Sequence, residues 1–233
     1  MKNENKEDMD YWDKFKFQWE RTWFDKQMGI KDDIQKYVWS QMNMFFSGVL
    51  LIYQVNCIDG NGHLVKRENL CTDLTFRQIS VPILRLLIES YFRVIYLCLC
   101  NENHTQVERF KKILSTTAVE YNKFRAEIQK HPEYFGSLIE GLPANAKTIP
   151  NLKSIRIKDM LKSISTSDKN NLSFLYGIYL LTSFYAHGNV DNVTWKIIFD
   201  QEKISYILPL DVFKIISIIS KLYLNIASSI WGV

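Results

Sequence analysis

The chain has 233 residues, of which 47% are hydrophobic and 23% charged, and its formal net charge is +4. This composition is typical of a soluble globular protein and excludes an intrinsically disordered chain. Only nine glycines and five prolines are present, so turn signals are few, and long helices are favoured over many short strands.

The sequence contains no recognisable signal for membrane insertion or export. Its longest apolar stretch, MFFSGVLLIYQV, is shorter than the roughly 20 residues that a membrane-spanning helix needs. The polar start MKNENKEDMD differs from a signal peptide, so we expect a cytoplasmic protein that does not bind a membrane.

The cysteines give no recognised metal-binding pattern. No CxxC is present, and a zinc site built from Cys57, His63 and Cys71 would have an unknown spacing. We therefore expect free thiols, no metal and no cofactor.

Residues 8–27 predict an amphipathic helix with an aromatic stripe. Trp12, Phe15, Trp19 and Trp23 follow one another at steps of three and four, which places them on one face. Such a stripe can stack nucleobases, but we expect it in the core or at a subunit interface. It is the leading candidate for self-association of the chain, because a lone helix would leave much apolar area in water.

A second helix is expected over DIQKYVWSQMNMFFSGVLLIYQV, followed by a turn-rich segment with Asp-Gly and Asn-Gly pairs. A third helix is expected over residues 74–100, which Pro82 either kinks or begins. Within a single domain over residues 1–233, the helical pair in residues 1–57 is a candidate appendage or dimer interface.

The segment TQVERFKKILSTTAVEYNKFRAEIQK predicts a fourth long helix with a heptad seam. This seam predicts packing against a partner helix with a left-handed crossing, while the opposite face, of mixed charge, is expected to be solvated. The members of the seam are Val107, Phe110, Leu114, Thr117, Tyr121, Phe124 and Ile128.

The positive charge is concentrated in residues 145–170. Six basic residues stand there against two acidic ones, an excess equal to the net charge of the whole chain. Such a patch favours an anionic partner such as RNA, although surface lysines beside a loop often serve only solubility. Lys153, Arg156 and Lys158 are the candidate contacts to nucleic acid or another ligand.

Near the end of the chain the sequence pattern changes from helix to strand and then back to helix. VTWKIIF and KISYILP, separated by DQE, predict a two-stranded β-hairpin over residues 193–208. The segment LDVFKIISIISKLYLNIASSIW predicts a last helix with a broad apolar stripe. The expected fold is all-α, a helical bundle of long helices with a small two-stranded β-hairpin before the last helix.

The third predicted helix carries charges on a largely apolar surface. From residue 83 to residue 99 it is apolar nearly all round, as in a buried helix, yet Arg85, Glu89 and Arg93 share one face and Tyr96 falls in the same arc. Buried charges need partners, because an unpaired one costs several kcal/mol.

The run NNLSFLYGIYLLTSFYAHGN shows the same combination. Tyr176, Tyr179, Ser183 and His187 line one arc of an otherwise apolar helix. Two buried helices that each carry one polar stripe satisfy these groups best by facing each other. The residues expected to meet there, as candidate catalytic groups, are Arg85, Glu89, Ser183 and His187.

A purely structural interpretation competes with this site. Glu89 can bridge Arg85 and Arg93 at four-residue spacing. His187 can lie in the last helical turn, favoured by the helix dipole, with Gly188 as a left-handed cap.

The segments RLLIESYFRVIYL and YLLTSFYAHGN, in a helical chain of this length, resemble the HEPN superfamily, in particular its abortive-infection-like and uncharacterised prokaryotic branches. The resemblance implies an all-helical bundle, frequent dimerisation, and either metal-independent RNA cleavage or a non-catalytic nucleotide-binding or scaffolding role. It implies antiviral defence or toxin-type growth control. The expected partners are a second copy of the chain, RNA or a nucleotide, and a cognate antitoxin or defence-system protein.

The chain departs from the catalytic members of that family. In these the His follows the Arg after four to six intervening residues, and the corresponding positions here hold Leu180, Leu181 and Thr182. Arg85 or Arg93 of the facing helix could supply the cation that stabilises a phosphoryl transition state, while His187 moves protons. Further candidate contacts to nucleic acid or another ligand are Arg93, Tyr179 and Asn189.

Overall fold

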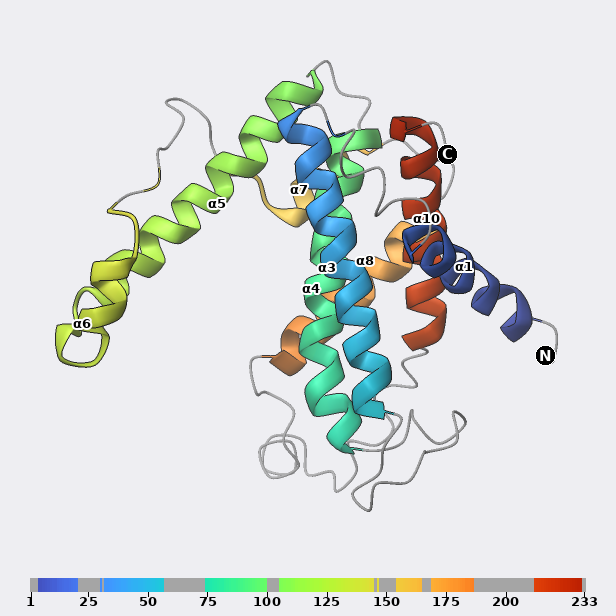
Figure 1. Ribbon diagram of the computed structural model, residues 1–233, viewed down its shortest axis with the longest axis horizontal. Coiled ribbons are helices and arrows are strands. Elements are labelled where there is room, and N and C mark those ends of the chain that lie inside the picture. Colours follow the sequence, from blue (N-terminus) through green and yellow to red (C-terminus); the bar gives the residue numbers. More distant parts are fainter. Residues whose placement is uncertain are drawn as a thin grey trace. The chain divides into compact units, whose positions relative to one another are not determined.

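The computed structural model is mostly helical in the part of the chain that it describes, which comprises residues 4–20, 30, 32–56, 74–99, 105–144, 146, 154–164, 169–186 and 212–231. None of these residues lies in a strand, so the all-α prediction is confirmed for them, and the predicted hairpin at 193–208 lies outside them. The helices are α1 (Glu4–Gln18), α3 (Asp33–Asn56), α4 (Leu74–Leu99), α5 (Gln106–Ile128), α6 (Pro132–Gly141), α7 (Ile157–Lys162), α8 (Lys169–Ala186) and α10 (Val212–Trp231) (Figure 1).

The chain divides into two compact units. The terminal unit comprises Met1–Tyr91 and Ser167–Val233, and the central unit comprises Phe92–Thr166. Helix α4 begins in the first and ends in the second. That residues 1–233 form a single domain stays a prediction.

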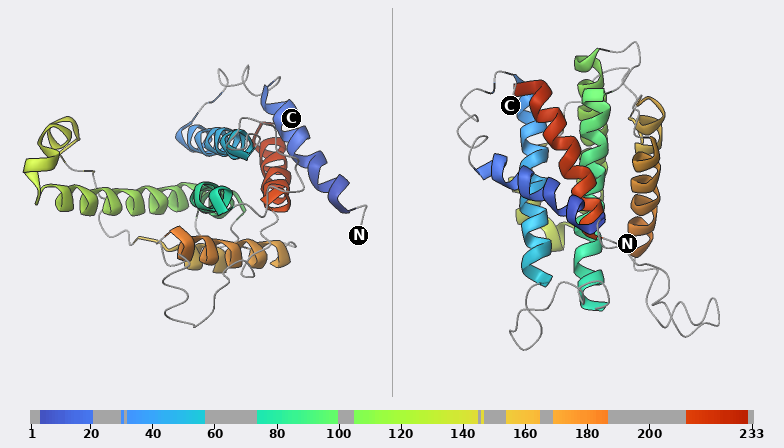
Figure 2. Two further views of the ribbon diagram at one scale, coloured as in Figure 1. Left: turned by 90° about the horizontal axis from the view of Figure 1, so that it is seen from below. Right: turned by 90° about the vertical axis from the view of Figure 1, so that its right-hand side faces the viewer.

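The aromatic stripe of α1 lies in the core of the terminal unit. Trp12, Phe15 and Trp19 are buried, and α1 packs against α10, which it crosses in the right-hand view of Figure 2. The rings of Phe15 and Phe45 lie 5.3 Å apart in an edge arrangement, which is favourable for aromatic pairs. The core interpretation of the stripe is therefore confirmed for these residues, which leaves them unavailable as a surface for self-association. Trp23 lies outside the described residues.

Helices α3 and α4 approach each other closely at Gly48 of α3. A β-carbon placed on Gly48 would lie 2.8 Å from Cδ2 of Leu87, which is buried. Near this point the Ser90 hydroxyl donates a hydrogen bond of 2.7 Å to Oε1 of Gln41. The heptad-like apolar positions of α3 are all buried, namely Val38, Met42, Phe45, Val49 and Ile52.

Helix α10 presents the apolar stripe that its sequence predicts. Val212, Ile215, Ile216, Ile219 and Ile226 are buried. Pro82 lies inside α4, not at its start.

In the central unit, α5 begins at a capping box. The Thr105 hydroxyl accepts from the backbone N of Glu108 at 3.3 Å, and the Glu108 carboxylate accepts from the backbone N of Thr105 at 2.8 Å. This pair satisfies two backbone donors that a helix start leaves open.

The two faces of α5 are not buried as the heptad pattern predicts. On the seam, Ile128 is buried, but Val107, Leu114 and Phe124 remain 51%, 43% and 48% exposed. On the face expected to be solvated, Arg109 is buried and donates from Nε and Nη2 to the carbonyl oxygen of Leu97 at 3.3 and 3.0 Å. The prediction of a solvated opposite face is wrong at Arg109, because the end of α4 offers this guanidinium a carbonyl acceptor.

Candidate functional site

The polar stripes of α4 and α8 meet at Arg85. Its Nε donates a hydrogen bond of 2.9 Å to Oγ of Ser183, across 98 residues of sequence. Both residues belong to the terminal unit. The predicted direct contact between the two stripes is therefore confirmed at this pair.

The hydroxyl of Ser183 both donates and accepts a hydrogen bond. Its Oγ lies 2.7 Å from the carbonyl oxygen of Tyr179, and a carbonyl can only accept, so the Ser183 proton points there. The oxygen then accepts from Arg85. A nucleophilic serine would instead give its proton to a base, so this geometry suits a residue that orients Arg85.

An aromatic face lies under the guanidinium of Arg85. Its Cζ is 5.5 Å from the ring centroid of Tyr179, within the range of a cation–π interaction. Tyr179 in turn stacks with Tyr176, with centroids 6.2 Å apart and planes inclined by 19°. Tyr176 was not among the ligand contacts expected from the sequence, although its three-residue spacing from Tyr179 was a usable signal.

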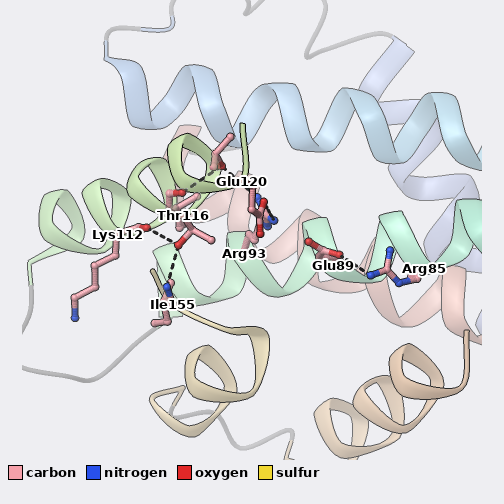
Figure 3. Close-up of polar contacts among 9 residues, drawn as sticks. Arg85, Glu89, Arg93, Lys112, Thr116, Glu120 and Ile155 are labelled. Carbon is pink, nitrogen blue, oxygen red and sulfur yellow. Dashed lines mark hydrogen bonds and ion pairs between the residues drawn. The ribbon is translucent and has the colours of Figure 1, made fainter. Parts of the chain in front are cut away.

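Glu89 is the counter-charge of the cluster. One carboxylate oxygen lies 3.8 Å from Nη2 of Arg85, one turn earlier on α4 (Figure 3). Both side chains are half-buried, with 27% of Arg85 and 21% of Glu89 exposed. Arg85 therefore contacts both the acidic side chain on its own helix and the hydroxyl of Ser183 on α8.

Arg93 belongs to the central unit. There its Nη1 donates to Oγ1 of Thr117 at 3.5 Å. Its Nη2 lies 3.8 Å from a carboxylate oxygen of Glu120 (Figure 3). Arg93 thus pairs with α5.

The basic segment before α7 is anchored on α5. The backbone N of Ile155 donates to the Thr116 hydroxyl at 2.9 Å (Figure 3). Arg156 is exposed and bonds Asp159, one of the two acidic residues counted in this segment, at 2.9 Å. Lys158 is exposed.

Three expected site residues, His187, Asn189 and Lys153, lie outside the described residues. Within the described part, no three or more His, Cys, Asp or Glu residues gather as a metal site would require. In the same part, no helix is both long and apolar enough to cross a membrane.

No model of a known protein family matches this chain, and no curated protein or solved structure matches it either.

Proposed function

We propose that the chain is a HEPN-like protein of antiviral defence or toxin-type growth control that binds RNA or a nucleotide at the cluster of Arg85, Glu89, Ser183 and Tyr179. The observation that carries the proposal is the orientation of Arg85. Its Nε is held by Ser183 and its guanidinium lies over the ring of Tyr179, while 27% of the side chain remains exposed.

This arrangement suits a phosphate group. Arginine binds phosphate through a planar fork of N–H donors, and fixing the guanidinium in advance lowers the entropy lost on binding. Within the described structure, the two Nη groups of Arg85 have only the long contact with Glu89. A phosphate can compete for these donors.

The stacked tyrosines beside the arginine suit a nucleobase. Tyr176 and Tyr179 form a stacked pair, and stacking of a base on an aromatic side chain contributes about 1–3 kcal/mol without strong sequence preference. A cation and an aromatic platform together favour a single-stranded RNA or a nucleotide over a purely anionic ligand.

Metal-independent RNA cleavage is the second candidate function. Arg85 would stabilise the charge of the phosphoryl transition state, and His187 would transfer protons. Ser183 would orient Arg85 and take no direct part, because its hydroxyl donates its hydrogen bond to the backbone carbonyl of Tyr179.

Binding is tested with the full chain and a fluorescently labelled single-stranded RNA, followed by fluorescence anisotropy. We expect Arg85→Ala to weaken binding by at least about tenfold, as loss of a charge-assisted bond of about 1.5–3 kcal/mol requires. Arg85→Lys keeps the charge but loses the Nε hydrogen bond to Ser183, and its affinity should lie between those of Arg85→Ala and the unchanged protein. Lys36→Ala removes one exposed charge from the same unit and should bind like the unchanged protein.

Folding must be separated from binding, because Arg85→Ala strands the half-buried carboxylate of Glu89. The double variant Arg85→Ala, Glu89→Gln removes both charges. We expect it to melt like the unchanged protein and still fail to bind. If the folded double variant binds RNA normally, the proposed site is wrong.

Cleavage is tested by incubating the same RNA with the protein in excess EDTA. Degradation that His187→Ala abolishes without a change in melting temperature would establish the catalytic function. Binding without degradation would leave the chain as a binding module.

A further inference from the structure

Glu89 places a carboxylate beside the guanidinium of Arg85 (Figure 3). The 3.8 Å between its oxygen and Nη2 of Arg85 is longer than a charge-assisted hydrogen bond of about 2.7–2.9 Å. An ionised carboxylate has about four lone-pair sites, and 21% of the Glu89 side chain is exposed. Glu89 can therefore accept hydrogen bonds from a ligand while it keeps its contact with Arg85.

The directions of α4 and α8 bring Glu89 close to the stacked tyrosines. Helix α8 runs in the opposite direction to α4 (Figure 2), and the two helices are joined where Arg85 bonds Ser183. Glu89 lies one turn after Arg85 on α4. Tyr179 lies one turn before Ser183 on α8, so Glu89 and Tyr179 lie to the same side of the bond between the helices.

The guanidinium of Arg85 contacts both of these groups. Its Cζ is 5.5 Å from the ring centroid of Tyr179, and its Nη2 is the atom nearest to the Glu89 carboxylate. All three residues belong to the terminal unit. An acceptor of hydrogen bonds and an aromatic platform therefore lie beside the same cation.

We infer that Glu89 accepts hydrogen bonds from the base of the bound nucleotide and thereby selects guanine. The inference rests on the proposed function, because it takes the base to stack at Tyr176 and Tyr179. It gives Glu89 a contact with the ligand in addition to its pairing with Arg85.

The hydrogen-bonding groups of the four bases differ in a way that a carboxylate distinguishes. An ionised carboxylate only accepts, and bases of single-stranded RNA are recognised on their Watson–Crick edges. Guanine presents two adjacent donors on that edge, N1–H and the N2 amino group, which match the two carboxylate oxygens. Adenine and cytosine each present one amino group beside an acceptor. Uracil presents N3–H between two carbonyl oxygens, so it should be bound most weakly.

The opposite charges of Arg85 and Glu89 divide the ligand in the same way. The guanidinium attracts a phosphate, whereas the carboxylate repels one. The side of Arg85 on which Glu89 lies therefore favours an uncharged group that donates hydrogen bonds. The base of a nucleotide is such a group.

The test is fluorescence anisotropy of the full chain with five labelled probes. Each probe is the same short single strand of uridines, in which one central position holds guanosine, inosine, adenosine, cytidine or uridine. Inosine differs from guanosine only by lacking the N2 amino group. We expect the guanosine probe to bind at least about tenfold more tightly than the inosine probe, because one charge-assisted hydrogen bond is lost.

Glu89→Gln tests whether the carboxylate is responsible. Its amide has one accepting oxygen, and its NH₂ group would meet a donor of guanine, so the ratio of the two affinities should fall close to one. Glu89→Asp keeps the charge on a shorter side chain and should retain part of the preference. Because the ratio compares two probes on the same protein, a partial loss of folded protein leaves it unchanged.

The matched control is Glu20→Gln, which makes the same change at another carboxylate of the terminal unit. The Glu20 side chain is 53% exposed and lies 4.0 Å from Nζ of Lys16. This variant should keep the ratio of the unchanged protein.

Three results would overturn the inference and leave the proposed binding site in place. They are equal binding of all five probes that still depends on Arg85, a guanosine preference that persists in Glu89→Gln, and an equal change of affinity for every probe in Glu89→Gln. The last result would limit Glu89 to its pairing with Arg85. Failure of the unchanged protein to bind any of the probes would reject the proposed function together with the inference.

Discussion

The α1 stripe of the terminal unit and the α5 seam of the central unit have the same spacing and opposite burial. Trp12 and Phe15 are buried, whereas Val107 and Leu114 remain about half exposed. The first stripe meets α10 and the aromatic residues of α3. Periodicity therefore fixes which residues share a face, and a complementary apolar surface elsewhere in the chain decides whether that face is buried.

The two units also differ in what holds them together. Phe15, Phe45 and Tyr223 form a cluster of buried rings in the terminal unit. The central unit adds to its buried apolar residues side chains that bond backbone groups, as Arg109 and Arg125 do. The first arrangement gains mainly from apolar burial, and the second from satisfying polar groups at helix ends.

The largest effect is expected at Phe45, which is fully buried and contacts Phe15 and Tyr223. Phe45→Ala leaves a cavity in the ring cluster and should lower the free energy of unfolding by about 3–5 kcal/mol. Urea unfolding followed by tryptophan fluorescence measures it. Phe17→Ala, on the exposed side of α1, is the control and should cost little. Equal losses for both would contradict a core centred on this cluster.

The corresponding test in the central unit is Arg109→Met, which keeps length but removes both bonds to Leu97. The expected loss is about 1.5–3 kcal/mol, typical for a charged hydrogen bond, because the Leu97 carbonyl loses its donors. Hydrogen exchange should speed up first at the end of α4 and the start of α5. Lys111→Ala, two residues away and exposed, should change stability by less than about 0.5 kcal/mol. Unchanged exchange in Arg109→Met would show that the bonds add nothing.

Two glycines in helices sharpen the comparison further. At Gly48 a new methyl group would meet Leu87 at 2.8 Å, whereas at Gly136 it would meet nothing within 4 Å. Gly48→Ala should therefore destabilise the protein by about 1–2 kcal/mol, since overpacking costs about 1–3 kcal/mol and helix propensity returns up to about 1 kcal/mol. Gly136→Ala should stabilise it by about 0.5–1 kcal/mol.

Thermal or urea unfolding of these two variants tests the prediction, because the free energy of unfolding should decrease for Gly48→Ala and increase for Gly136→Ala. Shortening the opposing side chain in the double variant Gly48→Ala, Leu87→Val should recover part of the loss. A stabilising Gly48→Ala would contradict the close approach of α3 and α4.

The smallest effect is a pH dependence at Cys98. Burial raises the pKa of its thiol from 9.0 to about 12, and the charge of Arg109 lowers it in part. The folded chain therefore keeps this proton at a pH where the unfolded chain has lost it. The stability contributed by the thiol is complete below about pH 9 and falls as the pH rises toward 12.

Between about pH 9 and pH 10 the free energy of unfolding should decrease by about 1 kcal/mol through this group. Urea unfolding at the two pH values measures the decrease, and Cys98→Ala should remove it. A slope that survives in Cys98→Ala would assign it to other groups.

The sequence by itself determined the helices and the residues that share their faces. The predicted helices over residues 33–55, 74–100 and 105–130 agree with α3, α4 and α5 within a few residues, because apolar periodicity and turn residues act locally along the chain. It also indicated that the stripes of α4 and α8 face each other, since buried polar groups require partners.

Only the tertiary structure decided which side chains and backbone groups are hydrogen-bond partners. That Ser183 accepts from Arg85, and that Arg109 reaches the carbonyl of Leu97, depends on helix ends and side chains brought together from distant parts of the sequence. It also decided that the α1 stripe is buried while the α5 seam stays half exposed. A helix face is buried only when another surface covers it. The pattern of one helix specifies its own apolar face and does not specify the surface that covers it.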